Sequence, residues 1–235
     1  MKTVLHKAET RGHADHGWLD TYHSFSFSGY YDPKRIHFGA LRVLNDDLVA
    51  GGMGFGMHPH DNMEIITIPT SGQLEHRDSM GNHGTISQGE VQVMSAGTGI
   101  QHSEFNHNKN EAVHLFQIWV FPDKKGLQPR YDQKKFDFDS LKNSFVTVVS
   151  PMGQNEGLNI HQNAWFSIGK LDKNSSYQYE LKDKANGVYA FVIEGDASIN
   201  GEKLNRRDGL GITDADRLEI KADSDAMILL MEVPV

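Results

Sequence analysis

Hydrophobic and polar positions alternate in short runs along most of the chain, and no long stretch shows the periodicity of an amphipathic helix. Alternation with a period of two is typical of β-strands that are buried on one face. Turn-forming residues separate these runs, as at Ser71-Gly72 and Gln88-Gly89. In the first half of the chain, the pattern predicts strands over residues 38–44, 62–68, 74–77, 91–95 and 113–121.

The pattern changes after Pro122, where prolines and charged residues indicate a linker. We expect this linker to span residues 123–144 and to contain short helical turns near residues 133–142. Strand patterning then resumes, so the second half echoes the first and indicates a degenerate internal duplication. We therefore predict an all-β protein of two sandwich or barrel domains, over residues 1–122 and 145–235. The strands expected in the second domain cover residues 145–149, 164–171, 188–194, 196–200, 217–220 and 227–233.

The composition narrows the classes of function. The chain has 235 residues, no cysteine and a formal net charge of −8. Disulfides and thiolate metal sites are therefore excluded, and direct binding to nucleic acid through a basic face is not expected. No apolar stretch approaches the ~18 residues that span a bilayer, and the first residues lack the apolar core of a signal peptide. We expect a cytoplasmic protein without a membrane segment.

Two short polar clusters carry the candidate chemistry. His58-Pro59-His60 and His102-Ser103-Glu104 each place two metal-type ligands two residues apart, and glycines surround both clusters. On a strand such residues point to the same face, so two facing strands could aim three imidazoles and one carboxylate at a single point. The fixed φ of Pro59 favours the extended geometry that this requires.

The distribution of histidine separates the two halves. Twelve of the 13 histidines lie at or before His114, and the last is His161. If the halves are related, only the first retains metal chemistry. The other reading of His58, His60 and His102 is that they are ordinary core or surface histidines. Loop positions are the simpler interpretation of His13 and His16, exposed cross-strand positions that of His76 and His83, and a structural role that of His114.

The segments Met94-Ser95-Ala96-Gly97 and Thr98-Gly99-Ile100-Gln101-His102-Ser103-Glu104 resemble the pirin family, as do Gly17-Trp18-Leu19-Asp20 and Tyr30-Tyr31-Asp32-Pro33. The likeness is strongest over residues 11–121. It implies a bicupin, with two β-sandwich or jelly-roll barrels in tandem and a divalent metal in the first barrel. Carried over by position, the resemblance implies the ligands His58, His60, His102 and Glu104.

The choice of carboxylate ligand rests on this resemblance. Generic cupins use the glutamate at the position of Glu64, whose parity matches that of His58 and His60, whereas pirins use the one at Glu104. We take Glu104 as the ligand and place Glu64 beside the site or in a salt bridge. Ser95 departs from the generic cupin motif, which has proline there, but fits the pirin pattern. Three imidazoles and one carboxylate suit Fe(II), our first choice, and also Ni, Cu, Mn, Co or Zn.

Further residues are candidates for the surroundings of the site. Gln117 is buried by pattern and needs a partner, so it could orient a metal ligand or bond to any buried carbonyl. His23, Phe25 and Phe27 share one face at a period of two and could line the mouth of a pocket, although alternating aromatic residues also pack in cores.

The resemblance implies a quercetin 2,3-dioxygenase, which opens a flavonol ring with O2 and releases carbon monoxide. The metal would bind the flavonol 3-hydroxyl oxygen, and Glu104 would act as the catalytic base. The alternative is a metal-binding, redox-sensitive regulator that acts through protein partners, and a third reading is a metal-free structural bicupin. We expect a monomer.

Overall fold

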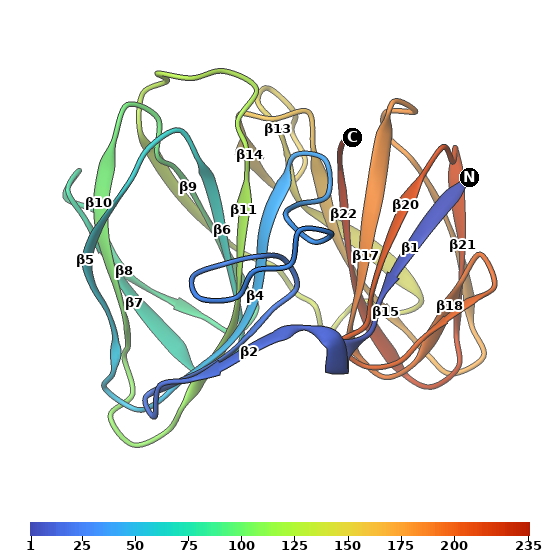
Figure 1. The fold of residues 1–235 in the computed structure, drawn as a ribbon, viewed down its shortest axis with the longest axis horizontal. Coiled ribbons are helices and arrows are strands. Elements are labelled where there is room, and N and C mark those ends of the chain that lie inside the picture. The colour runs from blue at the N-terminus through green and yellow to red at the C-terminus, as the bar shows by residue number, and fades with distance from the viewer.

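Two β-sandwiches lie side by side in the computed structural model, which describes residues 1–235 (Figure 1). Each sandwich contains one seven-stranded and one four-stranded sheet. Neighbouring strands are antiparallel, apart from one parallel pair, β13 (Ser144–Pro151) with β14 (Leu158–Ile160). The all-β bicupin fold predicted from the sequence is confirmed. The only helix is a three-residue 3₁₀ turn, Ala8–Thr10. The structure contains no helical segment with the length and hydrophobicity of a membrane span.

The first barrel holds the histidine-rich part of the chain. Its large sheet has the strand order β12-β9-β6-β11-β4-β3-β2, and its small sheet has the order β5-β10-β7-β8. The large sheet contains β2 Gly12–Asp15, β3 Leu19–His23, β4 Leu41–Val49, β6 Glu64–Ser71, β9 Glu90–Ser95, β11 Val113–Val120 and β12 Arg130–Lys135. The small sheet contains β5 Gly54–His60, β7 Gln73–Asp78, β8 His83–Ser87 and β10 Ile100–Asn106.

The second barrel repeats this plan. Its large sheet has the order β1-β20-β17-β22-β15-β13-β14, and its small sheet has the order β16-β21-β18-β19. The large sheet contains β1 Lys2–His6, β13 Ser144–Pro151, β14 Leu158–Ile160, β15 Trp165–Leu171, β17 Asn186–Glu194, β20 Gly209–Thr213 and β22 Ala226–Pro234. The small sheet contains β16 Ser176–Glu180, β18 Ala197–Ile199, β19 Glu202–Leu204 and β21 Arg217–Ala222.

The pairing of β1 and of β12 corrects the expected domain boundaries. β1 pairs with β20, so the first residues complete the sheet of the second barrel. The helical turns expected near residues 133–142 are wrong, because Arg130–Lys135 forms β12 and pairs with β9. As an edge strand, β12 has one neighbour and little apolar surface to bury, so its composition shows no alternation. Residues 130–135 therefore belong to the first barrel rather than to a linker.

The two large sheets pack against each other and form the main hydrophobic core. This core of 25 buried residues draws on both barrels, and Phe116 meets Phe191 edge to face within it, with ring centroids 5.5 Å apart. Phe25 also belongs to this core and packs on Tyr189. The expectation that Phe25 lines a pocket is therefore wrong, because the segment that follows β3 turns this ring toward the interface between the barrels.

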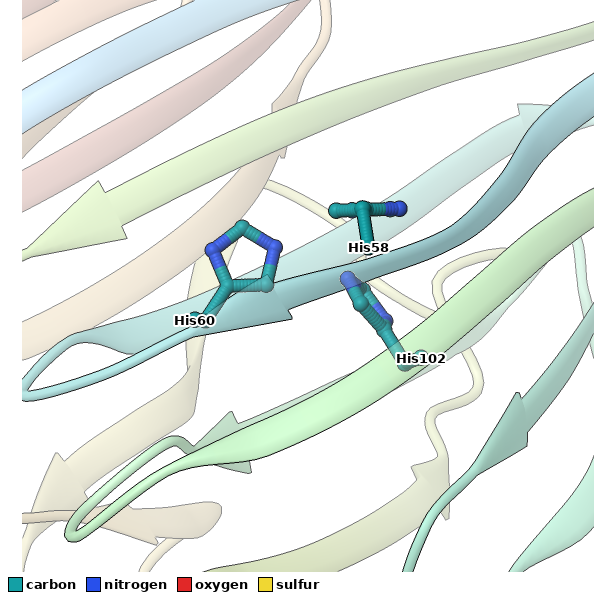
Figure 2. Close-up of side chains that lie close together, drawn as sticks. All are labelled: His58, His60 and His102. Atoms are coloured by element: carbon teal, nitrogen blue, oxygen red, sulfur yellow. The ribbon is translucent and has the colours of Figure 1, made fainter.

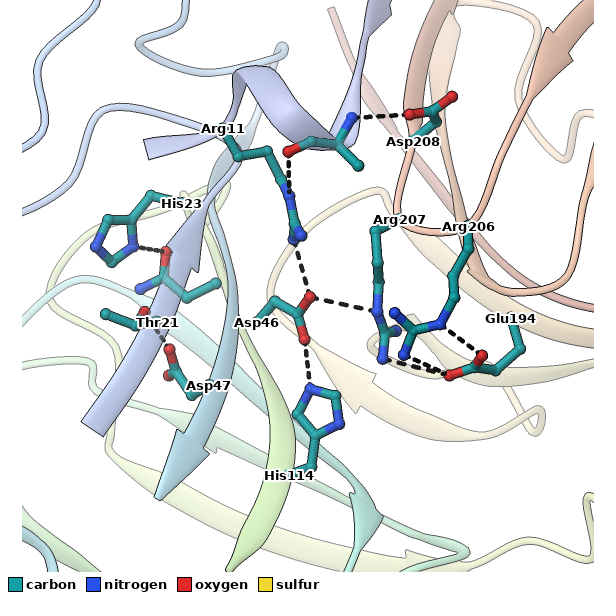
Figure 3. Close-up of polar contacts among 12 residues, drawn as sticks. Arg11, Thr21, His23, Asp46, Asp47, His114, Glu194, Arg206, Arg207 and Asp208 are labelled. Carbon is teal, nitrogen blue, oxygen red and sulfur yellow. Dashed lines mark hydrogen bonds and ion pairs between the residues drawn. The ribbon is translucent and has the colours of Figure 1, made fainter. Parts of the chain in front are cut away.

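A buried ionic cluster lies beside this core at the junction of the barrels (Figure 3). The carboxylate of Asp46 accepts hydrogen bonds from Arg11 Nη1 at 2.9 Å and His114 Nε2 at 2.6 Å, and pairs with Arg207 Nε at 3.3 Å. Burial alone would raise the pKa of Asp46, but the bond from His114 and the charges of Arg207 and Arg11 lower it to about 2. His114 thus has a structural position, as the sequence indicated, and the pairing of Asp46 with Arg207 ties the two barrels together.

Candidate metal centre

Three imidazoles converge at the face of the small sheet in the first barrel (Figure 2). His58 and His60 come from β5, and His102 comes from the neighbouring β10, where it is the register partner of His58. One ring nitrogen from each lies within 4.8 Å of the others. The ring centroids are 4.4 Å apart for His58 and His102, 4.8 Å for His60 and His102, and 4.9 Å for His58 and His60.

The surroundings disfavour the charged form of two of these rings, His60 and His102. Burial and the adjacent imidazoles lower the pKa of His60 to about 4 and that of His102 to about 3. Neutral imidazole is the form that binds metal ions. Both ring nitrogens of His102 are buried and lack a hydrogen-bond partner, which is rare for buried polar atoms unless a ligand or an ion completes them. The three residues therefore fit a borderline divalent cation.

Glu104 lies beside His102 but is held by other side chains. A register irregularity separates the two residues on β10, and the Glu104 carboxylate accepts a hydrogen bond from Gln117 Nε2 at 2.9 Å. The hydroxyl of Thr67 lies 3.4 Å from the other carboxylate oxygen. Gln117 thus contacts a candidate ligand, as the sequence suggested. The carboxylate groups geometrically with His102 and His76 rather than with the His58–His60 pair.

His76 is the residue that sequence reasoning placed wrongly. We expected an exposed cross-strand position, but His76 is fully buried, and its Nε2 donates to Asp78 Oδ2 at 3.2 Å. Its Nδ1 has no partner, and its ring stacks on Tyr131. The available signal was parity, since His76 shares its face of β7 with buried Leu74 and Asp78. Because His76 and Asp78 are polar, the sequence does not show the hydrophobic alternation that would have identified the inward face of β7.

Glu64 lies away from the histidine cluster, which corrects the expectation that it sits beside the metal site. Its buried carboxylate accepts a hydrogen bond from Ser95 Oγ at 2.7 Å, and burial raises its pKa to about 7. The alternation along a strand would have turned Glu64 to the same face as His60, but it is interrupted because Asn62 adopts a left-handed backbone with φ of 46°. That turn ends β5 and starts β6, so the two residues belong to different sheets.

A cavity of about 940 Å³ opens next to the imidazoles. His23 and Phe27 line it, as the sequence allowed, and His23 Nδ1 bonds to Asn45 Oδ1 at 2.9 Å. His13 and His16 are also in the lining and do not join the histidine cluster. The cavity therefore combines aromatic rings with titratable groups such as Glu104. Its lining includes five aromatic side chains: Trp18, Phe27, Tyr30, Phe55 and Trp119.

Tandem barrels with a histidine cluster in one of them define a bicupin with the donor set of a metal centre. The chain belongs to the pirin family: its residues 4–120 match the family model described as pirin, and residues 147–233 match the quercetinase C-terminal cupin domain.

Individual relatives agree over the full length. The chain is 45% identical over 230 residues to quercetin 2,3-dioxygenase of Escherichia coli strain K12, with 98% of each chain covered. It is also similar to the crystal structure of YhhW from Escherichia coli, with a TM-score of 0.95, 44% identity and coverage of 100% and 99%. A structure of the bacterial pirin YhhW in complex with nickel(II) gives a TM-score of 0.93 at 43% identity, covering 99% of each chain.

Proposed function

We propose that this protein is a metal-dependent dioxygenase that opens the ring of a flavonol of the quercetin type with O2 and releases carbon monoxide. The observation that supports this most is the cluster of three imidazoles at the wall of an aromatic-lined cavity. The 45% identity to a relative named quercetin 2,3-dioxygenase supports the substrate class.

His58, His60, His102 and Glu104 would hold the ion, with Fe(II) our first choice and Ni, Cu, Mn, Co or Zn as alternatives. When bound, a divalent ion would act as a Lewis acid that favours deprotonation of the flavonol 3-hydroxyl group. The nickel(II) complex of YhhW supports a divalent ion at this kind of site. The two unpartnered nitrogens of His102 support the assignment from this chain's own geometry.

Glu104 would accept the proton of the 3-hydroxyl group. Its carboxylate lines the cavity and lies at the bottom of a hydrogen-bonded chain, in which Thr67 donates to Gln117 Oε1 at 3.1 Å and Gln117 donates to Glu104. This chain fixes the orientation of the carboxylate before substrate enters. Phe27 and Trp119 meet edge to face, so one ring would present its face and the other its edge to the planar substrate, and both would exclude water from the reacting carbons.

The test is to follow quercetin absorbance under air with protein loaded with Fe(II), Ni(II) or Cu(II), and to measure carbon monoxide in the headspace. We expect bleaching with at least one metal. Glu104→Gln should lose turnover by about 100-fold or more, the usual contribution of a general base, while metal content is measured in parallel. Full turnover in that variant would refute the base assignment. Absence of bleaching with every metal would favour the redox-sensitive regulator that binds protein partners.

A further inference from the structure

The cavity beside the imidazoles carries a continuous polar patch, of which the proposed reaction uses only Gln117. Thr21 and His23 come from β3, Asn45 and Asp47 from β4, and Gln117 from β11, and all five line the cavity. The strands are neighbours in the large sheet, and the register pairs Thr21 with Asp47, His23 with Asn45, and Asn45 with Gln117. The patch is therefore a built feature of the sheet face that looks into the chamber.

Asp47 is the only acidic residue of this patch, and it has no counter-ion. The residue is 4% exposed, and its carboxyl group accepts a hydrogen bond from the Thr21 hydroxyl (Figure 3) and takes part in no ion pair. Successive residues of a strand face opposite ways, so the neighbouring Asp46 takes Arg11, Arg207 and His114 on the other side of the sheet.

This environment favours the protonated carboxyl group. Burial raises the pKa of Asp47 to about 7, and the negative charges of Asp46 and Glu104 act in the same direction, while the bond from Thr21 opposes them. A buried carboxyl group in this state has an O–H to donate as well as an oxygen to accept. On the wall of a cavity, this carboxyl group can form hydrogen bonds with the hydroxyl or carbonyl groups of a ligand.

We infer that Asp47 binds a hydroxyl group of the aromatic substrate and selects substrates that carry an oxygen substituent besides the one placed at the imidazoles. This inference rests on the proposed function, because it assumes that a flavonol occupies the cavity. The aromatic rings of the lining would hold the planar skeleton with little regard to its substituents, since stacking depends on the ring face. Asp47 would therefore set specificity among ring systems of the same shape.

The experiment compares two probes of the same skeleton under anaerobic conditions with Ni(II)-loaded protein. Quercetin carries hydroxyl groups on both ring systems, whereas 3-hydroxyflavone keeps only the oxygens of the central ring. Dissociation constants come from quenching of tryptophan fluorescence, since Trp18 and Trp119 line the cavity. The variants are Asp47→Leu and Asp47→Asn, and the control is Glu219→Gln, which changes an exposed carboxylate of the second barrel.

Asp47→Leu should weaken quercetin binding by about tenfold, the effect of losing one buried hydrogen bond. It should change 3-hydroxyflavone binding by less than about twofold, and Asp47→Asn should lie between Asp47→Leu and the wild type. Equal effects on the two probes, or no effect on quercetin, would overturn the role of Asp47 while leaving the proposed function intact. Failure of the wild type to bind either flavonol would overturn the proposed function and with it this inference.

A crystal structure of the wild-type complex with quercetin gives an independent test if Asp47→Leu does not fold, as circular dichroism would show. A substrate oxygen within hydrogen-bond distance of the Asp47 carboxyl group supports the inference. Quercetin bound in the cavity with Asp47 in contact with protein groups alone overturns it.

Discussion

The two barrels share one framework but differ in what fills them. The second barrel encloses a cluster of 16 buried hydrophobic residues between its large and small sheets. The first barrel has clusters of only six and four residues in the corresponding space, and its interior holds His76, His102, Glu104 and Gln92 instead. The same β-sandwich thus supports either a packed core or a reaction chamber, depending on the residues that face inward.

Buried polar groups show the same contrast. In the second barrel, the buried Glu232 carboxylate accepts hydrogen bonds from Tyr179, the backbone amides of Lys182 and Asp183, and Asn186. In the first barrel, His76, Gln92 and His102 retain buried side-chain atoms without partners, whereas the second barrel has one such atom, Nη1 of Arg207 at the junction. Satisfied groups stabilise the fold, whereas unsatisfied ones cost stability and are tolerated where a ligand or ion completes them. The core shared between the two large sheets stabilises the first barrel, whose interior has only small hydrophobic clusters.

The largest expected effect is on metal binding by the first barrel, and the same substitution should leave its folding almost unchanged. His102→Ala should weaken binding of Ni(II) by more than about 100-fold, because it removes the imidazole shared by both geometric groups of ligands. The free energy of unfolding of the metal-free protein should change by less than about 2 kcal/mol, since the His102 nitrogens make no hydrogen bond. Competition with a chelator and denaturant unfolding measure the two quantities. Unchanged nickel affinity would contradict the proposed site.

A change in the second barrel should have the opposite signature. Leu230→Ala removes a fully buried side chain of the apolar cluster and should lower the free energy of unfolding by about 2–5 kcal/mol. The metal content of the folded protein should stay at the wild-type ratio, because Leu230 lies in the barrel without the histidine cluster. Leu74→Ala, which alters the fully buried Leu74 in the first barrel, is the matched comparison. Loss of metal in Leu230→Ala would show that the barrels are not separable in function.

The smallest effect concerns the pH dependence of stability. Burial raises the pKa of Glu64 from 4.5 to about 7, so the folded state holds this proton more tightly than the unfolded chain. Its contribution is present below about pH 4.5 and is lost as the pH rises to about 7, by at most about 3 kcal/mol. Glu64→Gln should therefore flatten the fall in stability over this window. Thermal unfolding at several pH values measures it, and an identical pH profile in the variant would show that Glu64 is not responsible.

The sequence by itself predicted the all-β fold, the duplication and the barrel that carries the histidines. Alternation along a strand and the spacing His58-Pro59-His60 are local properties of the sequence, so they can be read without knowing which strands are neighbours in the fold. The same holds for His102 and Glu104, and for the scarcity of histidine in the second half.

Only the tertiary structure decided which strands meet and which way the ambiguous side chains face. β12 forms because β9 offers an edge, and β1 joins the second barrel because β20 is free to pair, and neither partner can be read from the local pattern. The turn at Asn62 breaks the parity that would have brought Glu64 to the histidines. His76 and Asp47 face the interior although they are polar, because contacts distant in the chain, to Tyr131 and Thr21, determine their environment.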